Sequence, residues 1–131
     1  MRPAAPEHKI VYVRFHKRVD ALLEEFSRKT GMKRASAVMW IQRRYFDILR
    51  EQGKTPETLT REDFNLTGIE ETYFISLGRA GDGSALGRGM QLTVDKSEER
   101  LFSLIAMRCE LSTRDLRTAI LVQYFHSLDM I

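Results

Sequence analysis

The hydrophobic positions of residues 9–52 follow two periods in succession. Residues 9–15 alternate between an apolar side and a mixed side, which predicts a β-strand with one buried face. The period then becomes that of an amphipathic helix ending at Gly31, and a second helix is predicted from about Arg34 to Gln52. The expected inward residues are Val11, Val13 and Phe15, then Val19, Leu22, Leu23 and Phe26, then Val38, Ile41, Tyr45, Ile48 and Leu49.

The same succession of periods returns near the other end of the chain. Residues 90–94 alternate again, and Asp95 followed by Glu98 has the pattern of a helix N-cap. Ser112 is expected to cap the final helix. The expected inward residues are Met90, Leu92 and Val94, then Leu101, Phe102, Leu104, Ile105 and Cys109, then Leu116, Ala119, Ile120, Tyr124 and Phe125.

A constant offset of 79 residues relates the two halves. Residues 41–49 and 120–128 share Ile, Tyr, Phe and Leu in one frame, and the same offset places Lys17 on Lys96. Internal repetition predicts architecture, here a strand-helix-helix unit written twice. One unit alone, of about 45 residues, would bury too little surface to be stable, so the units are expected to complete each other.

The expected domain boundaries are an extended arm over 1–8, a first unit over 9–52, a linker over 53–88 and a second unit over 89–131, the two units forming one compact domain. In the linker, Thr60 and Asp63 are expected to bound a helical turn, 72–77 to form a short strand, and the glycines of 78–89 to form a loop. Met39, Trp40 and Phe46 are expected to pack against the linker around residues 64–74, with a partner-docking surface as the alternative.

Composition and charge narrow the class of protein. Hydrophobic residues make up 43% and charged residues 30%, as in ordinary globular proteins, and the net charge of +3 permits a nucleic-acid partner without requiring one. A single Cys109 excludes an internal disulfide and is expected to fill core space. No apolar run reaches the ~18–20 residues of a membrane span, and the first six residues lack a signal-peptide core, so a cytoplasmic protein is expected.

No arrangement of residues predicts catalysis. His8, His16 and His126 are scattered, with no metal-ligand spacing and no neighbouring nucleophile. The glycine-rich stretch 78–83 lacks the lysine and following helix of a phosphate-binding loop. We therefore expect no enzyme activity, no cofactor and no metal.

The second unit resembles the ribbon-helix-helix (MetJ/Arc) superfamily. The resemblance rests on the strand, the Asp95 cap, the amphipathic helix and the stretch 111–116 (LSTRDL) followed by Ala119 and Ile120. In the first unit, His16 and Lys33 stand where the family has capping residues. The resemblance implies a mostly α fold with a two-stranded antiparallel β-ribbon, here a pseudo-twofold intramolecular dimer. Two units in one chain are similar in architecture to TraY-like and T-DNA-transfer accessory DNA-binding proteins.

A two-stranded ribbon fits the major groove of DNA, where outward side chains read base edges. The expected reading residues are Ile10, Tyr12, Arg14, Gln91 and Thr93. Phosphate contacts are expected at the N-termini of the second helices, from Lys33, Arg34, Ser112, Thr113 and Arg114. The plainer alternatives are the solvent face of a small sheet and ordinary capped, solvated helix ends.

The function expected from this resemblance is sequence-specific binding of double-stranded DNA, as a conjugation or DNA-transfer accessory factor or as a transcriptional regulator. The target is expected to be asymmetric, because the two strands carry different reading residues. Other expected partners are a second copy on adjacent sites, or a relaxosome or regulatory protein, and no membrane. The alternative function is a protein-interaction adaptor or antitoxin-like module that keeps the fold without specific DNA reading.

Overall fold

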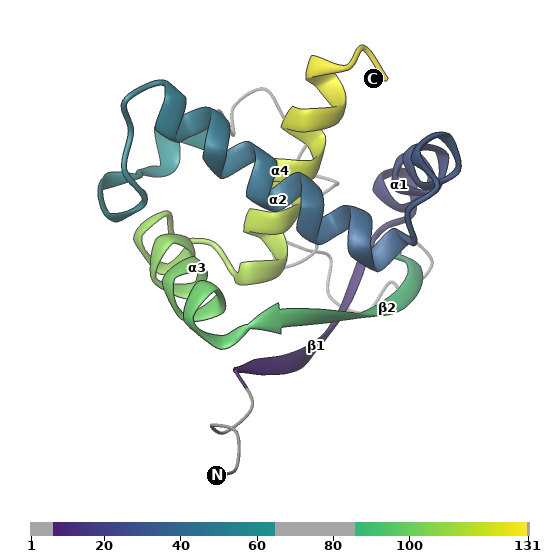
Figure 1. Cartoon of the computed structure of the whole chain (residues 1–131), viewed down its shortest axis with the longest axis horizontal. Coiled ribbons are helices and arrows are strands. Elements are labelled where there is room, and N and C mark those ends of the chain that lie inside the picture. Colours follow the sequence, from purple (N-terminus) through teal and green to yellow (C-terminus); the bar gives the residue numbers. More distant parts are fainter. Residues whose placement is uncertain (1–6, 65–85, 131) are drawn as a thin grey trace, which may run out of the picture.

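A computed structural model describes residues 7–64 and 86–130, which form a mostly helical fold with a two-stranded antiparallel sheet. The sheet lies along one edge of the molecule and the helices lie on one side of it (Figure 1). The elements in chain order are β1 (His8–His16), α1 (Lys17–Thr30), α2 (Arg34–Glu51), the 3-10 turns η1 (Pro56–Thr58) and η2 (Arg61–Phe64), β2 (Leu86–Asp95), α3 (Lys96–Arg108) and α4 (Thr113–Ser127).

The two strands come from different halves of the chain and pair with each other. Tyr12 lies opposite Gln91 and Ile10 lies opposite Thr93. The alternation predicted from the sequence is confirmed, because the inward positions of both strands are buried or half-buried. Both strands extend beyond their predicted bounds. The inward residues are Val11, Val13, Phe15, Met90, Leu92 and Val94.

The prediction that residues 87–89 belong to a loop is wrong, because β2 already begins at Leu86. Gly87 lies against α1, where an added Cβ would come within 2.6 Å of Cβ of Asp20. Gly89 lies beneath the hydroxyl of Tyr12. Glycine occurs within strands where another group approaches the backbone closely. The two glycines therefore mark close approaches within the strand.

The predicted helix ends are confirmed. Gly31 has a left-handed backbone with φ of 77°, and its amide bonds to the Ser27 carbonyl, which closes α1. Asp95 accepts hydrogen bonds from the amides of Ser97 and Glu98 at the start of α3. His16 caps the start of α1 with its ring, because its Nδ1 accepts a hydrogen bond from the Arg18 amide at 3.0 Å.

The core is centred on α4, which is buried on almost every side from Asp115 to Val122. The inward residues predicted for α1 are all buried, and those predicted for α2 and α4 are buried or half-buried. The prediction that Leu104 of α3 faces the core is wrong, because its side chain is 52% exposed. The stripe that faces the core in α3 runs through Phe102, Ile105 and Ala106, and Leu104 lies outside it.

The core also holds an ion pair that apolar patterning does not reveal. Arg117 of α4 bonds to Glu99 of α3, and the two side chains are only 1% and 6% exposed. The Arg117 guanidinium lies over the Phe102 ring, 4.5 Å from its centroid. Because charges are costly to bury singly, these two groups depend on each other.

The described part of the linker is fastened to α2. Leu59 and Phe64 are buried, and the Tyr45 hydroxyl donates a hydrogen bond to the Asp63 carbonyl at 3.4 Å. Burial, together with nearby Asp63, raises the pKa of Tyr45 to about 12. The predicted turn is confirmed, since the Asp63 carboxylate accepts from the Thr60 amide at 2.7 Å. The strand expected at 72–77 and the loop expected at 78–84 lie outside the described residues.

The second apolar side of α2 has two different neighbours. Phe46 packs edge-on against Phe64, as predicted, and also against Phe102. Met39 is buried. Among the described residues, the Trp40 ring packs against Phe26 of α1 and Tyr124 of α4, and it is partly exposed. Most of the linker segment predicted to contact it, residues 65–74, lies outside the described residues.

Candidate nucleic-acid interface

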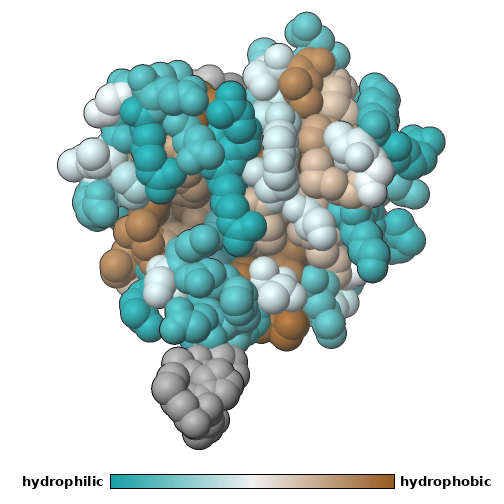
Figure 2. All heavy atoms as spheres, in the orientation of Figure 1, coloured by the Kyte–Doolittle hydropathy of each residue, from teal (hydrophilic) through white to brown (hydrophobic). Residues whose placement is uncertain are grey.

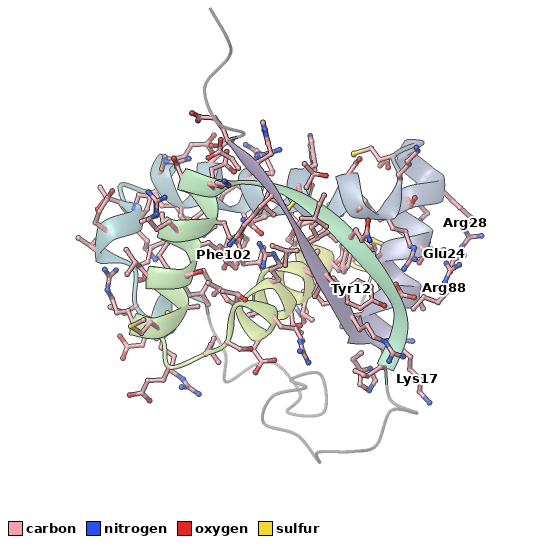
Figure 3. All side chains as sticks on the ribbon, turned by 90° about the horizontal axis from the view of Figure 1, so that it is seen from below. Tyr12, Lys17, Glu24, Arg28, Arg88 and Phe102 are labelled. Atoms are coloured by element: carbon pink, nitrogen blue, oxygen red, sulfur yellow. The ribbon has the colours of Figure 1, made fainter. Side chains whose placement is uncertain are left out.

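No described helix covers the outer face of the sheet, and the two strands run in front of the described helices in Figure 3. Ile10 and Tyr12 are 59% and 66% exposed on this face, although both are large and mostly apolar. Gln91 and Thr93 are exposed beside them. The register joins these four predicted reading residues into two cross-strand pairs, Ile10 with Thr93 and Tyr12 with Gln91. The structure therefore gathers them on one face.

Arg14, the fifth predicted reading residue, is held at the edge of this face. It is half-buried, and its Nε donates a hydrogen bond to the Gly87 carbonyl at 3.0 Å. This bond fixes the direction of the guanidinium, so a paired contact to a guanine would use the Nη1 and Nη2 groups. Arg14 is thus preoriented by the partner strand.

The N-terminus of α2 differs from what the sequence predicted. Lys33 is exposed and extended, and within the described residues its side chain makes no capping hydrogen bond. Arg34 turns back to bond to Asp20 of α1, and both side chains are largely buried. Lys33 and the first backbone amides of α2 remain the better anion contacts at this end.

The N-terminus of α4 is capped. The Ser112 hydroxyl accepts a hydrogen bond from the Asp115 amide at 3.1 Å. Ser112 and Arg114 are exposed, whereas Thr113 is half-buried. The two helix ends therefore differ in chemistry. The start of α2 has the cation Lys33 and no side-chain cap, whereas the start of α4 has the Ser112 cap followed by the cation Arg114.

The two ends of the ribbon also differ in charge. Asp95 accepts from the Glu98 and Ser97 amides, and the Glu98 bond is the largest cause that lowers the pKa of this carboxyl below its usual range. Asp95 is therefore an anion at one end of the ribbon. His16 stands at the corresponding end of β1, where its imidazole accepts a hydrogen bond from a backbone amide. An anionic ligand meets less repulsion at the His16 end.

Two exposed lysines at the ribbon were not assigned a role from the sequence. Lys17 begins α1 and Lys96 begins α3, each directly after a strand. Figure 3 shows Lys17 at one end of the ribbon. Their recurrence at the 79-residue offset was visible in the sequence, but only the strand pairing places one lysine at each end.

Other kinds of site find little support among these residues. Over residues 7–64 and 86–130, no group of three or more His, Cys, Asp or Glu side chains is arranged to hold a metal ion. No helix in the same part of the chain is long and apolar enough to span a membrane. Comparison of the chain with protein families, with curated proteins and with solved structures finds no match.

Proposed function

We propose that this chain is a tandem ribbon-helix-helix protein that binds double-stranded DNA in a sequence-specific manner through its β-ribbon. The observation that carries the proposal is the exposed, paired set of Ile10, Tyr12, Gln91 and Thr93 on a sheet face that no described helix covers. A two-stranded ribbon has the width to enter the major groove.

The strand register supports an internal twofold relation between the units. In a twofold ribbon, the residue on the axis faces its own equivalent. Gln91 is the residue 79 positions after Tyr12, and these two lie opposite each other. The sequence repeat and the strand pairing therefore agree on one axis, although they are independent observations.

The helix boundaries support the same relation. α1 begins at Lys17 and α3 at Lys96, again 79 residues apart, and α2 and α4 begin at Arg34 and Thr113 with the same spacing. The left-handed residue after the first helix also recurs, as Gly31 with φ of 77° and Glu110 with φ of 59°.

The exposed side chains suit base reading. Gln91 can make a paired contact with adenine, Thr93 can bond to a base or touch a thymine methyl, and Arg14 suits guanine. Tyr12 and Ile10 supply apolar contacts. Lys17, Lys96 and Lys33 would contact backbone phosphates on either side of the groove. Arg34 is left out of this set because Asp20 already neutralises it.

The proposed target is asymmetric. Tyr12 and Gln91 occupy the central pair with different chemistry, and the ribbon ends carry His16 and Asp95. A protein of this kind would act as an accessory factor in DNA transfer or as a transcriptional regulator, without catalysing a reaction itself.

The test is selection of DNA sites by the full chain, followed by fluorescence anisotropy at several salt concentrations. We expect an asymmetric consensus, and an affinity that falls steeply with salt because roughly 6–10 phosphates are contacted. Gln91→Ala should lower the preference for one base pair by about 1–3 kcal/mol. Arg44→Gln is the matched control, since Arg44 pairs with Glu51 on α2, outside the ribbon.

One observation favours the adaptor alternative. Leu104 and Met107 are large apolar side chains exposed on the outer side of α3, and Met107 is 72% exposed. If selection returns no consensus and binding does not depend on Gln91, the DNA proposal is wrong, and a protein contact through α3 becomes the function to test.

A further inference from the structure

A cavity of about 300 Å³ opens between α2 and α3. Its apolar wall is made by Phe46 of α2 and by Leu101, Phe102 and Ile105 of α3. In Figure 2, apolar surface is visible at the left of the view, in the region where α3 lies beneath the C-terminal part of α2. The volume is at the lower end of the range of small-molecule sites in proteins.

At the equivalent place in the other half of the molecule, which we call the filled side, buried side chains pack against one another. There α1 packs against α4, and the Phe26 and Phe125 rings lie 6.0 Å apart. Phe26 stands 79 residues before Ile105, so a larger side chain closes the filled side. Seven of the positions equivalent to those lining the cavity hold buried apolar residues, namely Val19, Leu22, Leu23, Phe26, Leu121, Val122 and Phe125. The two others, His126 and Asp129, are equivalent to Asp47 and Arg50 and are exposed.

Polar residues replace apolar ones on the open side. The cavity is lined by Gln42, Arg43 and Glu98. The equivalent residues on the filled side are Leu121, Val122 and Val19, respectively. Three such exchanges at one cavity cost core stability, because each removes apolar surface from the interface between the helices. A binding role explains why only one of the two equivalent places carries them.

Gln42 is the most informative of these residues. It lines the cavity and is buried, yet its side-chain oxygen Oε1 has no hydrogen-bond partner in the described part of the chain. Buried side-chain oxygens almost always accept a hydrogen bond. A donor from outside the chain would satisfy this oxygen.

The mouth of the cavity carries two ion pairs, each of one arginine and one carboxylate. Arg43 bonds to Glu98 at 3.2 Å, and Arg50 bonds to Asp47 at 2.9 Å. All four side chains line the cavity and are about half exposed. Exposed pairs of this kind are weak, so a ligand that carries both charges can exchange partners with them at little cost.

We propose that this cavity binds a small zwitterion with an apolar body, of the chemical class of free hydrophobic amino acids. The apolar side chain would lie against Phe46 and Phe102. The ligand carboxylate would pair with Arg43 or Arg50, and its ammonium group with Glu98 or Asp47. This site does not involve the ribbon and stands independently of the proposed DNA binding.

The experiment is isothermal titration calorimetry of the full chain with leucine, phenylalanine and tryptophan. We expect saturable binding of at least one of them. Glycine lacks the apolar body, and N-acetylphenylalanine and phenylalanine amide each lack one charge. These three should bind at least about tenfold more weakly than the best ligand.

Two variants place the residues of the filled side in the cavity. Ile105→Phe and Gln42→Leu should each weaken binding at least about tenfold, while circular dichroism shows a folded chain with an unchanged or higher melting temperature. Arg44→Gln lies on the same helix outside the cavity and should leave binding unchanged. The proposal is overturned if none of the three amino acids binds at about 10 mM, or if the singly charged analogues bind equally well. Should either filling variant fail to fold, the analogue series on the natural chain still decides the outcome.

Discussion

The Tyr12 hydroxyl lies over Gly89, one pleat along β2 from Gln91, which is the cross-strand partner of Tyr12. A Cβ at residue 89 would come within 1.8 Å of that hydroxyl oxygen. The most exposed aromatic side chain of the ribbon therefore takes its direction from a glycine on the opposite strand.

This relationship predicts different outcomes for two neighbouring glycines. Gly89→Ala should displace the flexible end of Tyr12 and change DNA preference, with a stability cost below about 0.5 kcal/mol. Gly87→Ala should cost about 1–3 kcal/mol, because the new methyl meets the buried Asp20 side chain at its Cβ. Urea unfolding of both variants, followed by circular dichroism, measures the difference. Equal costs would contradict the contacts described for the two positions.

The buried pair of Arg117 and Glu99 predicts a large loss when one member is removed. Arg117→Met should lower the free energy of unfolding by about 3–5 kcal/mol, because Glu99 would remain buried without its partner. Replacing both, as Glu99→Leu with Arg117→Met, should recover most of that loss. Arg43→Gln breaks a half-exposed pair and is expected to cost less than about 1 kcal/mol. A double variant no more stable than Arg117→Met would argue against mutual dependence.

Asp63 predicts a contribution to stability that depends on pH. The hydrogen bond from Lys54, followed by that from the Thr60 amide, lowers the pKa of this carboxyl in the folded chain. Its stabilisation is therefore present above the unfolded pKa of about 4 and is lost as pH falls through the lower folded value. The stability difference between the natural chain and Asp63→Asn should be largest near neutral pH and should shrink below about pH 4. Unfolding curves at several pH values test this, and a constant difference would contradict the shift.

The start of α2 has no side-chain cap, so a capping residue there should raise the stability of the chain and weaken its binding to DNA. Lys33→Ser would supply the cap that Ser112 gives α4 and should stabilise the chain by about 1 kcal/mol. The same change removes a cation from the proposed phosphate contact, so the salt dependence of DNA affinity should fall by about one unit of slope. Lys29→Gln, in the last turn of α1, serves as the control for charge alone.

Cys109 predicts a thiol that reacts only on unfolding. It is buried at the end of α3, and burial raises the pKa of this thiol. An aromatic disulfide reagent at pH 8 should leave the native thiol unmodified and react once urea unfolds the chain. Met107→Cys adds a thiol at an exposed position of the same helix and should react at once. Fast reaction of the natural chain would show that the end of α3 opens in the native state.

The sequence predicted the helices and strand faces because their periods are regular and their ends carry recognisable residues. Gly31 and Asp95 end or begin a helix through contacts within a few residues, so local chemistry specifies them. Leu104 was misassigned because it has the same hydrophobic character as its neighbours, and only the direction of the core separates them.

The rest depends on contacts between distant residues. The strand at Gly87 was missed because glycine usually indicates a loop, and its reason lies in Asp20, far away in the chain. Arg34 was expected to contact phosphate, but its charge is taken by Asp20 on another helix. Nothing in the sequence pointed to Gln42. Its position became informative only in the structure, where α2 packs with α3 differently from α1 with α4.

β1 and β2 are separated by most of the polypeptide, since His8 lies opposite Asp95. During synthesis, the first strand must leave the ribosome and remain without its neighbour until residue 95 has also emerged. Closing so long a loop favours a slow final step, in which helices form early and the sheet forms late. A chain truncated before β2 would keep an exposed edge open to intermolecular pairing, so nascent or nicked forms should aggregate where the complete chain does not.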